Sequence, residues 1–161
     1  MVIVLMGVAG SGKTTVGQKL AAELGWSFRD ADEFHPPENV AKMSSGLPLT
    51  DRDRAPWLAA IRAHIDACLA RGEGAVVTCS ALKEAYRRAL LADPARVKLV
   101  HLTGDFALLS ARIGARQGHF MKSEMLQSQL ATLESPRDAL AVDITPPPGE
   151  IVAHIRRALS L

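Results

Sequence analysis

A glycine-rich segment near the start of the chain has the residue types of a phosphate-binding loop. The residues Gly7-Val8-Ala9-Gly10-Ser11-Gly12-Lys13-Thr14 fit the pattern G-x-x-x-x-G-K-[ST]. Glycines let backbone N–H groups converge on phosphate oxygens, and the start of the following helix adds partial positive charge. We expect Lys13 to reach the β- and γ-phosphates of a nucleotide and the Thr14 hydroxyl to bind Mg²⁺. Thr15 is grouped with these nucleotide-binding residues, although its position also suits a plain helix residue.

Two acidic residues, Asp30 and Asp32, follow the second predicted strand. The strand ends that carry ligands lie on one edge of a parallel sheet, so both acids are expected beside the phosphate-binding loop. Carboxylates at positions i and i+2 can divide two tasks: one orients hydrated Mg²⁺, and the other accepts a proton from an attacking hydroxyl. The third strand ends in Thr78-Cys79-Ser80 without the acid that often holds Mg²⁺ in such folds. The alternative is that Asp30 and Asp32 simply lie in a solvated turn and bind no ligand.

The segment 106–123 is basic and contains no acidic residue. Arg112 and Arg116 lie at positions i and i+4 of one predicted helix face, and His119 and Lys122 follow them. Such a segment, with Gly118 as a hinge candidate, suits a lid at about 116–124 that closes over a polyphosphate. The alternative is an ordinary solvated helix face.

The composition limits the classes of protein that the chain can belong to. A length of 161 residues predicts one domain and leaves no room for a separate substrate domain. The net charge of +2 and the 4% content of aromatic residues argue against nucleic acid or a membrane as the main partner. The chain has no apolar run of transmembrane length and no signal peptide pattern. Cys68 and Cys79 are expected to be free thiols, which favours a reducing, cytoplasmic location.

Apolar runs and amphipathic stretches alternate along the whole chain, which predicts an α/β fold. This is the three-layer P-loop NTPase arrangement, a five-stranded parallel sheet with helices on both faces. Thr50 and Asp53 have the spacing of a helix capping box with Asp in place of Glu. The expected strands are 2–6, 26–29, 75–79, 97–102 and 140–144, and the expected helices are 13–24, 50–72, 82–91, 106–116, 125–133 and 151–159, with one helical turn near 40–43.

Five motifs together resemble the gluconokinase family over nearly the whole chain. They are G-V-A-G-S-G-K-T-T at 7–15, D-A-D-E-F-H-P at 30–36, K-M-S-S-G-L-P-L-T-D-R-D-R-A-P-W-L at 42–58, C-S-A-L-K-E-A-Y-R at 79–87 and R-Q-G-H-F-M at 116–121. Leu130 departs from the family, which often has an aromatic residue there. The resemblance implies ATP-dependent phosphorylation of D-gluconate at its 6-hydroxyl, with ATP and Mg²⁺ as cofactors. It also suggests a homodimer.

The resemblance assigns roles to several residues. Lys13, Asp32 and Arg116 would be catalytic, with Arg116 meeting the transferring phosphate, Asp32 holding the attacking hydroxyl, and Asp30 joining Thr14 at Mg²⁺. Arg112 would pack on the adenine, which the segment 142–148 borders. Gluconate needs cations for its carboxylate and partners for its hydroxyls. The candidates are the cations Arg54, Lys83 and Arg87 and the hydrogen-bonding residues His35, Ser80, Tyr86 and His119.

Two alternatives stay open at this point. The first is another small-molecule kinase of the shikimate kinase type. Such a kinase would carry a run of glycines after the third strand, but this chain has Cys79-Ser80-Ala81-Leu82-Lys83 there. The second is a regulatory module that binds ATP without turnover. The sequence argues against a GTPase, because Asn39, the only asparagine, is followed by Val40, and no aspartate has a glycine three residues later. Trp57 and Cys79 are expected to pack in the core.

Overall fold

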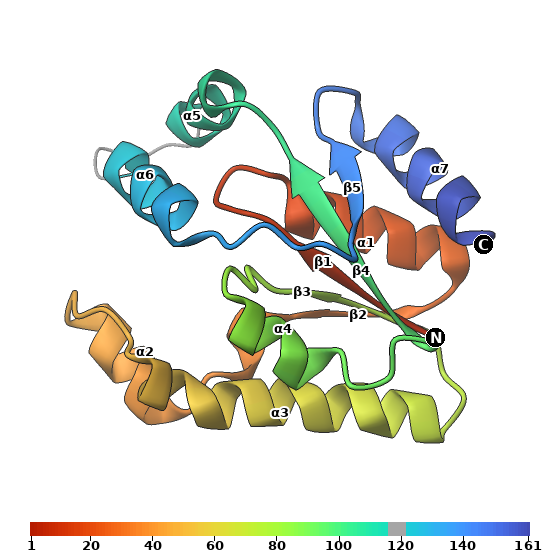
Figure 1. Cartoon of the computed structure of the whole chain (residues 1–161), viewed down its shortest axis with the longest axis horizontal. Helices are drawn as coiled ribbons and strands as arrows, with labels where there is room; N and C mark the ends of the chain where they lie inside the picture. Colours follow the sequence, from red (N-terminus) through yellow and green to blue (C-terminus); the bar gives the residue numbers. More distant parts are fainter. Residues whose placement is uncertain (116–121) are drawn as a thin grey trace.

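The computed structural model describes residues 1–115 and 122–161, and its centre is a parallel five-stranded sheet. The strands lie in the order β2-β3-β1-β4-β5 (Figure 1). β1 is in the middle, and its Val4 pairs with Val77 of β3 and with Leu99 of β4. The strand bounds are β1 Val2–Met6, β2 Ser27–Asp30, β3 Ala75–Thr78, β4 Val97–Thr103 and β5 Leu140–Asp143.

Helices cover both faces of this sheet, as the alternating pattern predicts. α1 and α7 contact each other and the strands on one face, and α3 and α4 pack together on the other (Figure 1). The helix bounds are α1 Lys13–Leu24, α2 Pro37–Ser44, α3 Asp51–Ala70, α4 Glu84–Leu90, α5 Phe106–Gly114, α6 Lys122–Thr132 and α7 Pro148–Leu159, and a short 3₁₀ helix, η1, spans Ala31–Phe34. Within the described ranges, no helix is long and apolar enough to cross a membrane.

The side chains of β1 show why the sheet is buried on both faces. Val2, Val4 and Met6 point into the core under α3 and α4, whereas Ile3 and Leu5 point into the core under α1 and α7. All five are fully buried. A continuous apolar run without polar alternation is the expected sequence of such a strand.

Most predicted elements are confirmed, with boundaries that differ by at most three residues. α3 begins with the predicted capping box, in which the Thr50 hydroxyl accepts from the Asp53 N–H and the Asp53 carboxylate accepts from the Thr50 N–H. For residues 35–50 the sequence predicted irregular structure with one helical turn, but the structure has the eight-residue helix α2 there. Pro37 lies in its first turn, where proline is compatible with a helix. α4 starts two residues later than predicted because Lys83, its N-cap residue, has an extended backbone, with φ −97° and ψ 144°.

The carboxyl ends of the strands meet at one edge of the sheet, as they must when all strands are parallel. β1 leads into the phosphate-binding loop, β2 into Asp30 and η1, and β3 into Cys79 and Ser80. β4 leads into α5, and β5 leads into the loop before α7. The candidate chemistry of the sequence therefore gathers at this edge.

Candidate active site

The loop between β1 and α1 has the backbone shape that a phosphate-binding loop requires. Gly10 and Gly12 have φ values of +79° and +82°, which side-chain-bearing residues rarely adopt. A Cβ atom on Gly10 would also lie 2.9 Å from Ile113 Cγ1 and 2.9 Å from the Leu109 carbonyl oxygen. The loop therefore needs glycine at position 10 both for its conformation and for its close packing on α5.

Lys13 and Thr14 follow the loop at the start of α1. The Lys13 ammonium donates to the Val8 carbonyl at 3.2 Å, so it lies back across the loop. The Thr14 hydroxyl donates to Asp30 Oδ2 at 3.3 Å, which joins the loop to the end of β2. Asp30 also accepts from the Asp32 N–H at 3.0 Å through Oδ1, and this fixes the acidic turn.

Thr14 and Asp30 provide two oxygen ligands for a metal ion, but they do not form a complete metal-binding site. Among the residues described, no three His, Cys, Asp or Glu side chains cluster closely enough to hold a metal ion alone. Mg²⁺ commonly takes only one or two protein oxygens and fills its other positions with water and substrate phosphates. The hard oxygens of Thr14 and Asp30 fit that pattern.

Asp32 keeps solvent contact at the start of η1 and lines a pocket beside the loop. Its partial burial is the main cause that raises the pKa of its carboxyl above the ordinary value, and the negative charge of Asp30 adds to the effect. The charges of His35 and Lys13 lower the same pKa. A carboxylate with a raised pKa is a better proton acceptor than an ordinary one, as a general base requires.

A pocket of about 280 Å³ lies on the other side of the loop. Arg112 is part of its wall, and its Nη2 donates to the Ile144 carbonyl at 2.6 Å, which fixes the guanidinium beside Gly12. Thr15 also lines this pocket, on the side of α1. Together with Pro146 and Pro148 from the predicted adenine-bordering loop, these residues form a slot of the right kind for a flat base.

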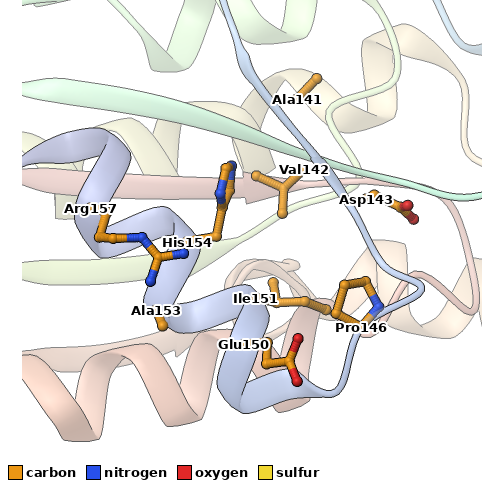
Figure 2. A pocket seen from close by; sticks show the side chains of 9 residues that line it. All are labelled: Ala141, Val142, Asp143, Pro146, Glu150, Ile151, Ala153, His154 and Arg157. Atoms are coloured by element: carbon orange, nitrogen blue, oxygen red, sulfur yellow. The ribbon is translucent and has the colours of Figure 1, made fainter.

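A hollow of about 650 Å³ adjoins this slot and shares Pro146 and Ile151 with it. Figure 2 shows that its labelled side chains come from β5, from the following loop and from α7. None of the individually predicted site residues lines it, but Val142, Asp143 and Pro146 belong to the segment 142–148 that was predicted to border the adenine. The hollow is a surface groove that flanks the slot beside Arg112.

A third pocket, of about 420 Å³, lies at the same sheet edge and is defined here as the acceptor pocket. Its walls come from η1, from α2 and the turn after it, from α3, from the turn after β3, from α4 and from α6. Five of the predicted substrate residues meet there: Asp32, His35, Arg54, Ser80 and Tyr86.

The predicted cations Arg54 and Lys83 lie together around one acid, Asp51. The Lys83 ammonium donates to Asp51 Oδ1 at 2.9 Å, Arg54 Nη1 lies 3.9 Å from the same oxygen, and the Tyr86 hydroxyl also donates to it. The hydrogen bonds from Tyr86 and Lys83 lower the pKa of Asp51. Two positive charges and one negative charge leave Arg54, Lys83 and Asp51 with a net charge of +1, which complements one carboxylate. Of these three residues only Arg54 lines the acceptor pocket, so the structure does not bring the predicted substrate residue Lys83 into its wall.

Arg87 does not line the acceptor pocket, in contrast to its predicted substrate contact. It is only 5% exposed, and its Nη1 donates to the carbonyls of Ala81 and Leu82 at 2.9 and 3.0 Å. Those carbonyls belong to the turn in which Ala81 has its positive φ. Arg87 therefore supports the turn that forms one wall of the pocket.

His35 is held in a defined position and protonation state. Its ring stacks on Trp57 at 4.6 Å between centroids, and its Nδ1 lies 3.3 Å from Asn39 Nδ2. The amide nitrogen can only donate, so neutral His35 carries its hydrogen on Nε2. Burial is the main cause that lowers the pKa of His35, which keeps the ring neutral at pH 7 despite the opposing charge of Asp32.

Sequence reasoning missed three residues that shape this site: Asn39, Asp51 and Gln129. Asn39 is buried and donates to the Asp53 carbonyl at 2.9 Å as well as to His35. A single amide side chain in a short helix gives no sequence signal of such a role. Gln129, on α6, accepts from the Ala9 N–H of the loop at 2.6 Å, a contact across 120 residues that no local pattern encodes.

Two predicted residues, Arg116 and His119, lie outside the described residues, as does most of the predicted lid.

Trp57 is buried, as predicted, and its indole N–H donates to the Ala31 carbonyl at 2.7 Å. Cys79 is also buried, and burial raises the pKa of its thiol to about 12. A thiol with that pKa stays protonated at neutral pH, which agrees with a packing role.

Comparison with known proteins places the chain in a family. Residues 9–146 match the shikimate kinase family. The chain is 52% identical over 136 residues to the gluconokinase of Gluconobacter oxydans, covering 84% of this chain and 76% of that one. It is 42% identical to the thermoresistant gluconokinase of Escherichia coli, covering 94% and 89% of the two chains.

Solved structures agree with these relatives. A gluconokinase from Sinorhizobium meliloti is 46% identical, with a TM-score of 0.82 over 98% of this chain and 94% of that chain. A shikimate kinase from Aquifex aeolicus, at 22% identity and a TM-score of 0.59 over 99% and 96% of the two chains, shares the fold. The chain therefore belongs to the shikimate kinase family of P-loop kinases and, by its much higher identity to them, to the gluconokinases.

Proposed function

We propose that the protein transfers the γ-phosphoryl group of ATP to the 6-hydroxyl of D-gluconate. One observation carries the proposal: the acidic turn at the end of β2 joins two different sites. Asp30 contacts Thr14 of the phosphate-binding loop, and Asp32, two residues later, lines the acceptor pocket. The relatives named above are gluconokinases. Gluconate has a single carboxylate, for which Arg54 of the acceptor pocket is a cationic partner.

The nucleotide would bind across the loop, with its base in the slot beside Arg112. Its phosphates would lie over the loop N–H groups other than that of Ala9, which donates to Gln129. Lys13 would move from the Val8 carbonyl to the β- and γ-phosphates. Thr14 and Asp30 would hold Mg²⁺, directly or through water, and the ion would neutralise phosphate charge when bound. Removal of Mg²⁺ with EDTA is expected to abolish turnover.

The acceptor would lie in the pocket with its carboxylate toward Arg54 and Lys83 and its terminal hydroxyl toward Asp32. His35 would donate from Nε2, and Ser80 and Tyr86 would bond the remaining hydroxyls. The hydroxyl oxygen forms a new bond to the γ-phosphorus while the bond to the β-phosphate oxygen breaks. The hydroxyl proton passes to Asp32, and ADP leaves with the electron pair of the broken bond.

Closure of the segment around 116–124 would exclude water, and Arg116 and His119 would then reach the phosphate and the acceptor. The buried free thiols Cys68 and Cys79 suit a reducing compartment such as the cytoplasm. A homodimer stays a prediction, which sedimentation equilibrium would test.

An acceptor panel tests the proposed function against its two alternatives. ADP release from Mg-ATP is measured with gluconate, other aldonates, shikimate and nucleoside monophosphates. We expect the strongest stimulation by gluconate. The strongest stimulation by shikimate would overturn the choice of substrate, and no stimulation by any acceptor would favour an ATP-binding module without turnover.

A further inference from the structure

Gln129 on α6 touches both halves of the proposed site. Its Oε1 accepts a hydrogen bond from the Ala9 N–H of the phosphate-binding loop at 2.6 Å. The same side chain lines the acceptor pocket, together with Met125, Ser128 and Thr132 of its helix. Gln129 therefore lies at the boundary between the phosphate-binding loop and the acceptor pocket.

The bond to Ala9 determines which way the Gln129 carboxamide faces. A backbone N–H can only donate, so the side-chain oxygen must face Ala9 and the NH₂ group must face away from it. Within the described part of the chain, Nε2 has no hydrogen-bond partner. The amide thus has two N–H donors available, on a half-buried side chain beside Asp32's pocket.

α6 holds this amide on a fixed support. Leu126, one turn earlier, is fully buried in the core under α1 and α7, and α6 packs against α5. At the other end of α6, the Glu134 N–H donates to the Leu82 carbonyl at 2.8 Å. The Glu134 carboxylate accepts from the Glu84 N–H at 2.7 Å. Both contacts anchor α6 to the turn that forms one wall of the acceptor pocket.

We infer that Gln129 is a catalytic residue, whose Nε2 donates a hydrogen bond to an oxygen of the γ-phosphoryl group during transfer. The inference rests on the proposed function. Charge spreads over the equatorial oxygens of the phosphoryl group in the transition state, and a preorganised donor aimed at them lowers the barrier. Gln129 supplies such a donor from the side of the loop that faces the acceptor pocket.

Two variants separate this role from simple support of the loop. Gln129→Glu keeps an oxygen acceptor for the Ala9 N–H but replaces the NH₂ donor with a negative charge. Gln129→Ala removes both groups. Gln127→Glu is the matched control, because Gln127 lies exposed on the same helix and outside the acceptor pocket.

We expect Gln129→Glu and Gln129→Ala each to lower kcat about 10- to 100-fold, the effect of losing one hydrogen bond to a charged group. The KM for gluconate and the Kd for ADP, measured by titration calorimetry, should change less than about threefold, because neither ligand contains the γ-phosphoryl group. Gln127→Glu should keep wild-type kcat, and thermal unfolding of all three variants checks that they fold.

The results that would overturn the inference differ from the result that would overturn the proposed function. Near wild-type kcat in Gln129→Glu, with a loss only in Gln129→Ala, would show that Gln129 merely supports Ala9 and would overturn the inference. Equal loss of ADP affinity and kcat would also overturn it, since the residue would then shape the loop as a whole. If the wild-type protein shows no gluconate-dependent ADP release, the proposed function itself is wrong and the inference falls with it.

Discussion

Replacing Asp32 with asparagine removes a negative charge and a proton acceptor while it keeps the size of the side chain. Asp32 lines the acceptor pocket and is the proposed general base. Loss of a general base lowers rates by about 10²- to 10⁴-fold. The backbone N–H of residue 32 still donates to Asp30 in the variant, so the acidic turn and the contact between Thr14 and Asp30 are kept. We therefore expect kcat to fall by that factor while the Kd for ADP changes little.

The same substitution is expected to raise stability, because the pKa of Asp32 is raised in the folded protein by partial burial and by Asp30. A raised carboxyl pKa means that the folded state disfavours the charged form. The wild-type protein thus loses stability as the pH rises from the ordinary value of 3.8 through the raised pKa, and the loss persists above it. The asparagine side chain carries no such charge, so the Asp32→Asn variant should be the more stable protein at pH 7 and gain nothing below about pH 3.8.

The assays are ADP release under saturating ATP and gluconate, and urea unfolding at pH 7 and at acid pH. Asp138→Asn is the matched control, since Asp138 is an exposed aspartate outside the acceptor pocket. A kcat within about threefold of wild type in Asp32→Asn would refute the role of Asp32 as the base, whose loss should cost far more. Lower stability of this variant at pH 7 would refute the electrostatic reasoning.

Three further substitutions test separate parts of the site. Lys13→Ala should lower kcat by about 10²-fold or more while the thermal unfolding temperature stays close to wild type, because the ammonium stabilises phosphate charge; unfolding at room temperature would contradict this. Arg112→Ala should raise the KM for ATP roughly 2- to 30-fold through loss of base stacking and leave the KM for gluconate unchanged; equal changes in both would count against a nucleotide slot. Asn39→Ala should cost about 1–3 kcal/mol in urea unfolding, because it leaves the Asp53 carbonyl and His35 Nδ1 without their donor; an unchanged unfolding curve would refute that network.

The parts of the structure that depend on local sequence patterns could be predicted from the sequence. The strand of residues 2–6 is apolar throughout because both of its faces are buried, and the capping box at Thr50 places the start of α3 within one residue. Parallel strands bring their carboxyl ends to one edge, so the meeting of the phosphate-binding loop with Asp30 could be predicted.

Contacts between distant elements could not be predicted in the same way. A substrate contact was predicted for Arg87 because it is a cation in a motif that resembles the gluconokinases, but in the structure its buried guanidinium donates to two backbone carbonyls. Asp51 has no sequence signal beyond its motif, and its pairing with Lys83 across 32 residues depends on how α3 and α4 pack. The bond from Ala9 to Gln129 likewise depends on where α6 lies over the loop.

The identity of the phosphorylated product tests the central claim most directly. Wild-type protein is incubated with Mg-ATP and D-gluconate, and the product is examined by ³¹P NMR without proton decoupling. Transfer to the 6-hydroxyl places the phosphorus next to a CH₂ group, so the account predicts a new phosphate monoester signal split into a triplet. A doublet, which reports a phosphate on a CH group, or the absence of any gluconate-dependent ester would contradict the account.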